Sequence, residues 1–383
     1  MPFLHLKNPR TGYYLLSLLV FTVIVIVLFF GLRPKKWLSA NNVHWLADEK
    51  ALSFRDPGIA YVDELCIFAE EQQAQEWSLQ IIVAPENLDR LGFRPIVTIH
   101  NGDDRLQFTL WQWGDSLIVM NGDDYTYSRK WPRISAMNVL RTGEVSFITV
   151  TSSHFGTRLF INGALANEMK NWQITLPHGG KKQQLLLGNS VYGQHSWEGE
   201  IFGLALYGKS VTRERVQHDY EKWLHNRMLL ADSMDEPLFL YTFREGAGSF
   251  AADWTGNSKS LQIPTRQLVL QKTFLAPPWH NFTLNRSFWV DAIVNFSGFV
   301  PLGALLCLWL RQLPALSGKY AAPVCVAFCF FLSLSIEIAQ AWLPNRFSSL
   351  SDLVLNTLGA WAGVFFLEIV LRVRGDKAQE KPV

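Results

Sequence analysis

The chain has 383 residues, 49% of them hydrophobic, which is enough for more than one domain and for a sizeable core. Its net charge of +2 gives no electrostatic argument for nucleic acid, and no Lys/Arg-rich patch or nucleic-acid motif is present, so DNA and RNA are excluded as expected partners. Long apolar runs lie at both ends and strand-like alternation fills the middle, which predicts a membrane protein.

The first predicted element is the apolar run "YYLLSLLVFTVIVIVLFFGL", from Tyr13 to Leu32. It carries no charge and has about the 20 residues that cross a bilayer as a helix. A secretory signal is the alternative, because Lys7 and Arg10 precede the run and Leu38–Ala40 resembles a cleavage site. Signal peptides have shorter apolar regions, and three basic residues separate this run from that site, so we expect a retained anchor.

The next segment, from about Ala51 to Gln267, consists of short alternating strands separated by turn signals, which predicts a β-sandwich or barrel. NGDD follows an apolar strand twice, at Asn101–Asp104 and Asn121–Asp124, and Asn-Gly suits a tight hairpin turn. The turn carboxylates are also candidate Ca²⁺ ligands, although acidic loops are more often simply solvated. These candidates are Asp103, Asp104, Asp123 and Asp124.

Aromatic side chains recur along the same segment and are candidates for stacking against a ligand if they are exposed. Aromatic residues in strands more often belong to a core, so both interpretations stay open. The candidates are Trp111, Trp113, Tyr125, Tyr127 and Trp131.

Four stretches of this segment resemble laminin G-like, concanavalin A-like sandwiches: Trp77–Glu86, Ser146–Ala166, Leu185–Tyr220 and Tyr241–Pro264. The third carries an LGN turn, a W-x-G-x-I strand, an LALY strand and a trailing short helix. The EGAG…DWTGN part of the fourth often opens such domains but here follows LALY, which implies a permuted strand order with adjacent chain ends. Adjacent ends allow insertion between two helices. The resemblance implies an all-β jelly roll that recognises carbohydrate or protein and seldom catalyses a reaction. It also makes the aromatic residues named above candidates for stacking against sugar rings.

Three further apolar runs, at about Phe288–Leu310, Tyr320–Leu343 and Leu350–Leu371, bring the predicted membrane helices to four. An even number places both termini on one side, whose flanks carry eight basic residues against five on the other, so the termini are predicted to be cytoplasmic. The sandwich is then outside the cytoplasm. Its sequence contains a single cysteine, Cys66, which excludes a disulfide framework and favours a bacterial inner-membrane protein.

The expected fold class is therefore a multi-domain membrane protein: a four-helix unit with the sandwich inserted between helices one and two. The expected boundaries are a cytoplasmic tail at 1–12, helix one at 13–32, the sandwich at 40–285, helices two to four at 288–373 and a second cytoplasmic tail at 374–383.

Polar residues recur in the last three helices at spacings that place them on shared helical faces. In the expected topology they lie at similar depth near the outer surface, where ionisable residues are candidates for function. These residues are Asp291, Asn295, Glu337, Gln340, Arg346, Asp352 and Asn356.

Structural roles compete with a functional one for several of these positions. Asp352 fits the third helical residue of a capping box that Ser349 begins, and Gln340, like Asn295, is able to bond across helices. Gly359 and Gly363 form a small-xxx-small face that predicts close helix packing.

Glu337 is harder to explain structurally, because an unpaired carboxylate at this depth would protonate or seek a cation. Arg346, nine residues later, is the nearest candidate partner. A structural ion pair and an active-site pair look alike in sequence, so both interpretations stay open.

The same residues resemble the VanZ-like family, through the pattern N-x₂-GF-x-P-x-G, then IE-x₂-Q, then R-x₅-D-x₃-N-x₂-G-x₃-G. The family is named after a glycopeptide (teicoplanin) resistance determinant and its activity is not settled, so the resemblance implies an envelope role rather than a reaction. The pattern is met by Asn295, Gly298, Phe299, Pro301, Gly303, Ile336, Glu337, Gln340, Arg346, Asp352, Asn356, Gly359 and Gly363.

Three functional hypotheses follow. The first is an envelope protein in contact with the lipid bilayer, whose sandwich recognises a glycan or a protein partner above the polar layer. The second is a non-catalytic membrane scaffold. The third is a membrane-embedded enzyme acting on a lipid-linked substrate, with Glu337 or Asp352 as general base or metal ligand and Arg346 holding a phosphate or carboxylate. The sequence offers no nucleophile–base pair or phosphate loop for the third, and it decides no cofactor beyond the candidate Ca²⁺.

Overall fold

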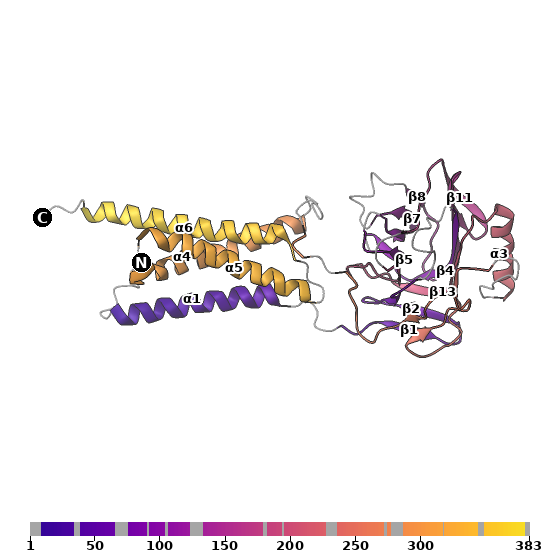
Figure 1. Ribbon diagram of the computed structural model, residues 1–383, viewed down its shortest axis with the longest axis horizontal. Helices are drawn as coiled ribbons and strands as arrows, with labels where there is room; N and C mark the ends of the chain where they lie inside the picture. Colours follow the sequence, from indigo (N-terminus) through magenta and orange to yellow (C-terminus); the bar gives the residue numbers. More distant parts are fainter. Residues whose placement is uncertain are drawn as a thin grey trace. The chain divides into compact units, whose positions relative to one another are not determined.

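A computed structural model of the chain separates into two units, residues 1–37 with 272–383 and residues 38–271, and each is described by itself (Figure 1). It describes residues 9–33, 39–65, 76–89, 92–103, 106–122, 133–178, 182–193, 195–226, 236–271, 274–276, 286–316, 318–343 and 348–379.

Residues 38–271 form two antiparallel eight-stranded sheets, which confirms the predicted all-β sandwich. The first sheet has the order β1 (Val43–Leu46), β2 (Ala51–Phe54), β13 (Gly199–Tyr207), β4 (Trp77–Pro85), β9 (Ser146–Ser153), β10 (Gly156–Ile161) and β11 (Ala164–Lys170), with β14 (Phe239–Tyr241) pairing β13. The second has the order β15 (Phe250–Ala251), β16 (Leu261–Gln262), β3 (Ala60–Val62), β12 (Gln184–Leu187), β5 (Arg94–His100), β6 (Phe108–Trp113), β7 (Ser116–Asn121) and β8 (Arg133–Ala136).

The core lies between the sheets because alternate residues of each strand point inward. In β4 these are Leu79, Ile81 and Val83, and in β9 they are Ile148 and Val150, all of which are fully buried in one cluster. The opposite face of the first sheet is covered by helix α3 (Arg213–Asn226), which buries its Val216 and Trp223. The β9–β10–β11 end of this sheet lies near the start of α3.

The chain enters and leaves the sandwich side by side. Ala40 forms an antiparallel bridge with Arg266, and the backbone N–H of Asn41 donates to the carbonyl of Thr265 at 3.1 Å. The side-chain amide of Asn41 donates to the carbonyl of Pro264 at 2.7 Å. This pairing confirms the predicted proximity of the ends of the sandwich.

The turn at the first NGDD sequence is confirmed, but its predicted tight hairpin geometry is wrong. β5 ends at His100 and β6 begins at Phe108, so the loop is longer than two residues, and among its described residues only Gly102 has a positive φ, +93°. At the second NGDD sequence, the residues that follow Gly122 lie outside the described ranges. The asparagines act through their side chains instead, since Asn121 exchanges hydrogen bonds of 2.8 and 3.0 Å with the backbone of Thr175.

The tight Asn-Gly turn occurs in the hairpin between β10 and β11. There Asn162 and Gly163 have φ values of +51° and +78° between the paired residues Ile161 and Ala164. Both positive φ values match the turn that suits the twist of paired strands.

The other unit is helical, with α1 (Pro9–Leu32), α4 (Arg286–Leu310), α5 (Ala321–Trp342) and α6 (Leu350–Gln379), and with short 3₁₀ turns at Pro314–Leu316 and Gly318–Tyr320. Among the described residues, four helical spans are long and apolar enough to cross a membrane: Arg10–Leu32, Trp289–Leu310, Ala321–Trp342 and Leu350–Val373. They match the four predicted apolar runs.

Glycines allow α4 and α6 to approach closely. A Cβ on Gly359 would lie 2.1 Å from the carbonyl oxygen of Phe296, and a Cβ on Gly363 would lie 2.0 Å from that of Val300. Neither position has room for a side chain, which confirms the predicted packing role of the small-xxx-small face.

Candidate functional site

The polar residues of α5 share one buried face of the helix. Ser333, Glu337 and Gln340 follow at spacings of four and three and are 0%, 1% and 7% exposed. Each of them forms a hydrogen bond with another helix or with the residue that precedes one. This face therefore holds two residues of the predicted polar layer, Glu337 and Gln340, in contact with other helices.

Glu337 binds the start of α6. Its Oε2 accepts the backbone N–H of Ser349 at 2.7 Å, directly before the helix begins at Leu350. The first N–H groups of a helix lack partners within the helix and favour a negative charge. The carboxylate of Glu337 thus stabilises the N-terminus of α6, and the N–H it binds is the one that a capping box would use.

Two further bonds connect α5 to its neighbours. The side-chain amide of Gln340 donates to the carbonyl of Gly31 in the last turn of α1 at 2.7 Å, and the amide of Asn356 on α6 donates to the hydroxyl of Ser333 at 2.9 Å. The carbonyl oxygens of a final turn have no partner inside the helix, so Gln340 satisfies one of them. Gln340 therefore forms a hydrogen bond between helices, which confirms the structural role predicted for it.

The segment at 274–276 is bonded to the same helix start. The backbone N–H of Ala276 donates to the carbonyl of Ser348 at 2.8 Å, and that of Leu350 donates to the carbonyl of Ala276 at 3.0 Å. The hydroxyl of the fully buried Ser348 also accepts the N–H of Leu275 at 3.0 Å. Glu337 and this bridge together fix where α6 begins.

Of the seven predicted residues, Glu337, Gln340 and Asn356 each form a hydrogen bond with another element. Asp291 is exposed and Asn295 half-buried on α4, and Asp352 is half-buried in the first turn of α6. Arg346 lies outside the described residues.

The predicted sugar-stacking aromatics need a correction at Trp111. It is 2% exposed because its ring packs against Phe93 at 5.7 Å, so it presents no open surface to a sugar. Trp113 is 39% exposed and its ring lies 4.4 Å from the same Phe93. Tyr125, Tyr127 and Trp131 lie outside the described residues.

Of the predicted Ca²⁺ ligands, Asp103 is exposed, and its N–H is bonded to the side chain of Asn101 at 3.1 Å. Asp104, Asp123 and Asp124 lie outside the described residues. Within the ranges that the structure describes, no three His, Cys, Asp or Glu side chains are grouped so as to hold a metal ion.

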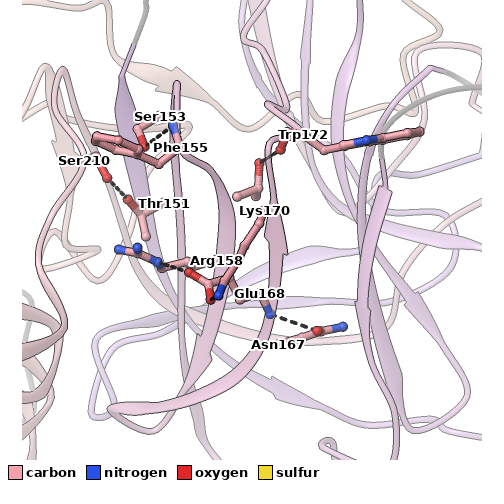
Figure 2. Close-up of polar contacts among 10 residues, drawn as sticks. Thr151, Ser153, Phe155, Arg158, Asn167, Glu168, Lys170, Trp172 and Ser210 are labelled. Carbon is pink, nitrogen blue, oxygen red and sulfur yellow. Dashed lines mark hydrogen bonds and ion pairs between the residues drawn. The ribbon is translucent and has the colours of Figure 1, made fainter.

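An open hollow of about 390 Å³ lies on the outer side of β10 and β11, beside the start of α3, and we name it the β10–β11 hollow. Its volume is within the usual range for small-ligand sites. Arg158 and Glu168 face each other across the two strands, and Arg158 Nε donates to Glu168 Oε1 at 2.7 Å (Figure 2). The hollow is lined by Arg158, Phe160, Leu165, Glu168, Ser210, Val211, Thr212, Arg213 and Glu214.

The charges and hydroxyls of this hollow are held in place. The hydrogen bond from Arg158 lowers the pKa of the Glu168 carboxyl, which keeps it ionised. Thr151 and Ser210 bond through their hydroxyls at 2.7 Å (Figure 2). Because these groups are ordered before any ligand arrives, the hollow is able to bind a polar molecule at a lower entropic cost.

Two exposed aromatic residues lie at the end of the same strands. Phe155, in the turn between β9 and β10, is 67% exposed, and Trp172, just after β11, is 50% exposed. The N–H of Asn171 donates to the carbonyl of Phe155 at 2.9 Å, which joins the two turns. Large exposed aromatic surface beside polar groups is typical of recognition sites.

Sequence reasoning missed this surface. The stretch Ser146–Ala166 has a strand–turn–strand pattern, and the His-Phe-Gly sequence in its turn indicates an exposed aromatic residue. The signal for Phe155 was therefore present. No local signal marks the pairing of Arg158 with Glu168, because it depends on the register of two strands.

A second hollow, of about 520 Å³, lies at β15 and β16. Its one charged lining residue is Lys259, which already forms a hydrogen bond with Glu64. The β10–β11 hollow offers more charged groups and is the stronger candidate.

Fold and site together define a membrane protein that carries a β-sandwich with an open polar surface. Residues 238–371 match the VanZ/LLP1 family profile, and residues 64–217 match that of the Concanavalin A-like lectin/glucanases superfamily. Both resemblances expected from the sequence are thereby confirmed, and the chain carries a VanZ-like region and a concanavalin A-like domain. No curated protein matches the chain.

Solved structures resemble the sandwich at low identity. A Bacteroides ovatus protein assigned as carbohydrate-binding is 12% identical, with a TM-score of 0.40, over 56% of this chain and 61% of its own. A carbohydrate-binding module of a Ruminococcus gnavus sialidase, bound to sialyllactose, is 12% identical, with a TM-score of 0.33, over 48% of this chain and 94% of its own. The fourth domain of a Geobacillus stearothermophilus arabinanase, bound to arabinotriose, is 14% identical, with a TM-score of 0.37, over 47% of this chain and 85% of its own.

Proposed function

We propose that this protein is a multi-pass membrane protein of the bacterial cell envelope whose sandwich binds a glycan at the β10–β11 hollow. The observation that carries the proposal is the open hollow itself, in which the preformed Arg158–Glu168 pair lies beside hydroxyl groups. Saccharide hydroxyls both donate and accept hydrogen bonds, so a site that offers charged donors and acceptors together suits them.

In this proposal the sandwich is an insertion between the first and second helices of a four-helix VanZ-like unit, in the inner membrane. Both termini are cytoplasmic and the sandwich is extracytoplasmic, as the positive-inside rule predicts. The adjacent ends of the sandwich support insertion, because Ala40 and Arg266 are paired.

The buried polar network of the helices acts as a scaffold in this proposal. Glu337, Gln340 and Asn356 each bond a backbone group or a side chain of another element. Such bonds fix helix packing without requiring a substrate. The membrane unit would thus hold the glycan-binding sandwich at the envelope surface.

Filling the hollow should abolish glycan binding. Leu165 is 37% exposed in its wall, and a Leu165→Trp variant places an indole in the space that a sugar would occupy. We expect a loss of binding of at least tenfold, about 1.4 kcal/mol, on an array of envelope glycans probed with the full chain in nanodiscs.

The matched control is Leu224→Trp, since Leu224 on α3 is 40% exposed and does not line the hollow. It should bind as the unaltered protein does. Equal binding by both variants would place the glycan elsewhere. If no glycan binds the unaltered protein, pull-down of envelope proteins tests the alternative of a protein partner.

A further inference from the structure

The charged groups of the β10–β11 hollow are not equally satisfied, and this imbalance bears on the class of ligand. Arg158 uses its Nε to bind Glu168, and no partner of its two Nη nitrogens occurs in the part of the chain that the structure describes. Figure 2 shows these nitrogens pointing away from Glu168. The outer edge of the guanidinium is therefore available to a ligand.

Arg213 provides a second such group. It is the first residue of α3, lines the same hollow and is exposed, and no hydrogen bond or ion pair of its side chain is found within the described ranges. Two guanidinium groups with free donors thus border one hollow. A planar guanidinium binds a carboxylate through two parallel hydrogen bonds, which a lysine is unable to do.

The two carboxylates of the hollow, by contrast, already have partners. Glu168 binds Arg158, and Lys170 Nζ lies 3.9 Å from its other oxygen. Glu214 lies in the first turn of α3, and a hydrogen bond with its own backbone N–H lowers the pKa of its carboxyl. The groups with unused hydrogen-bond donors are therefore cationic, and a ligand anion would be the complement.

We infer that the ligand of the β10–β11 hollow is an acidic saccharide, whose carboxylate binds between Arg158 and Arg213. This inference rests on the proposed glycan binding and names its chemical class. The saccharide hydroxyls would bond the Glu168 carboxylate and the hydroxyls at Ser210 and Thr212. Because the site is open to solvent, the carboxylate contributes specificity more than a large share of the affinity.

The test compares two ligands that differ only in the acid group: a galacturonic acid oligomer and the galactose oligomer obtained by reducing its carboxylates. Binding to the full chain in nanodiscs is measured by isothermal titration calorimetry. We expect the acidic oligomer to bind about tenfold more tightly at low salt, with the preference shrinking as salt is raised. Arg213→Gln and Arg158→Gln should each reduce this preference for the acidic oligomer.

Arg141→Gln is the matched control, because its side chain is 77% exposed and does not line the hollow. It should keep the full preference. The Arg213 variant also controls for misfolding, since its side chain has no hydrogen bond or ion pair among the described residues to lose. Equal affinity for both oligomers would refute the acidic ligand and leave glycan binding intact. Binding of neither oligomer, together with an array that shows no glycan at all, would refute both.

Discussion

Replacing Gly363 by alanine is expected to destabilise the helical unit by about 3 kcal/mol, because α4 and α6 have no room for even one methyl group between them. The added Cβ would lie 2.0 Å from the carbonyl oxygen of Val300 and 2.9 Å from the amide nitrogen of Ala304. Both are backbone atoms, so no side-chain rotation relieves the clash. Thermal unfolding in nanodiscs, followed by the helical circular dichroism signal, measures the loss.

Gly298→Ala provides the matched control on α4. Apart from the neighbouring residues and backbone of its own helix turn, no atom of the described residues lies within 4 Å of a Cβ built there. The same substitution should therefore be neutral or stabilise by about 0.5–1 kcal/mol through helix propensity. Equal midpoints for the two variants would contradict the close packing of α4 on α6.

Removing the Glu337 carboxylate is expected to cost about 2–3 kcal/mol, the usual loss for a buried hydrogen bond to a charged group. In Glu337→Ala the N–H of the half-buried Ser349 loses its acceptor, and the start of α6 loses a stabilising charge. Glu337→Gln keeps an acceptor oxygen of similar reach and should lose about 1 kcal/mol or less. Unfolding midpoints of the two variants, measured side by side, check the ranking.

The glutamine variant also separates a scaffold from an enzyme. A scaffold needs an acceptor at this position, whereas a general base needs a carboxylate. If Glu337→Gln unfolds at nearly the normal temperature and still supports growth under glycopeptide or envelope stress, the scaffold reading is supported. A well-folded Glu337→Gln protein that fails in such cells would instead favour the membrane-embedded enzyme.

In the β10–β11 hairpin, the sequence predicts the turn but not the register of the two strands. Asn162-Gly163 identifies a two-residue turn, and counting back from the Ile161–Ala164 pair would place Arg158 opposite Asn167. A bulge between Leu159 and Phe160 shifts the register by one residue, so that Glu168 faces Arg158. A shift of one residue moves every following side chain to the other face. The candidate site therefore depends on an irregularity that the local pattern does not show.

The prediction that Trp111 stacks against a sugar was wrong for a related reason. Alternation along β6 correctly excludes it from the cluster between the sheets, but Phe93, which precedes the neighbouring strand β5, covers its ring. A residue that points out of a sheet is exposed only if no loop lies over it. Strand period alone gives the direction of a side chain and not what covers it.

Local sequence patterns are enough to predict the two architectures and the two family resemblances. Strand alternation has a period of two and a membrane helix needs about 20 apolar residues, and both are local properties that a linear pattern carries. The sequence also predicts that polar groups occur at the ends of the last three helices. Which of these groups form hydrogen bonds, and with which partners, depends on how the helices pack.

Three contacts make this difference concrete: Glu337 with the N–H of Ser349, Gly363 with the carbonyl of Val300, and Arg158 with Glu168. Each joins two separate elements, so each depends on a helix crossing or a strand register that many distant residues set together. A free energy of a few kcal/mol, summed over such long-range contacts, selects one arrangement among those that the local pattern allows.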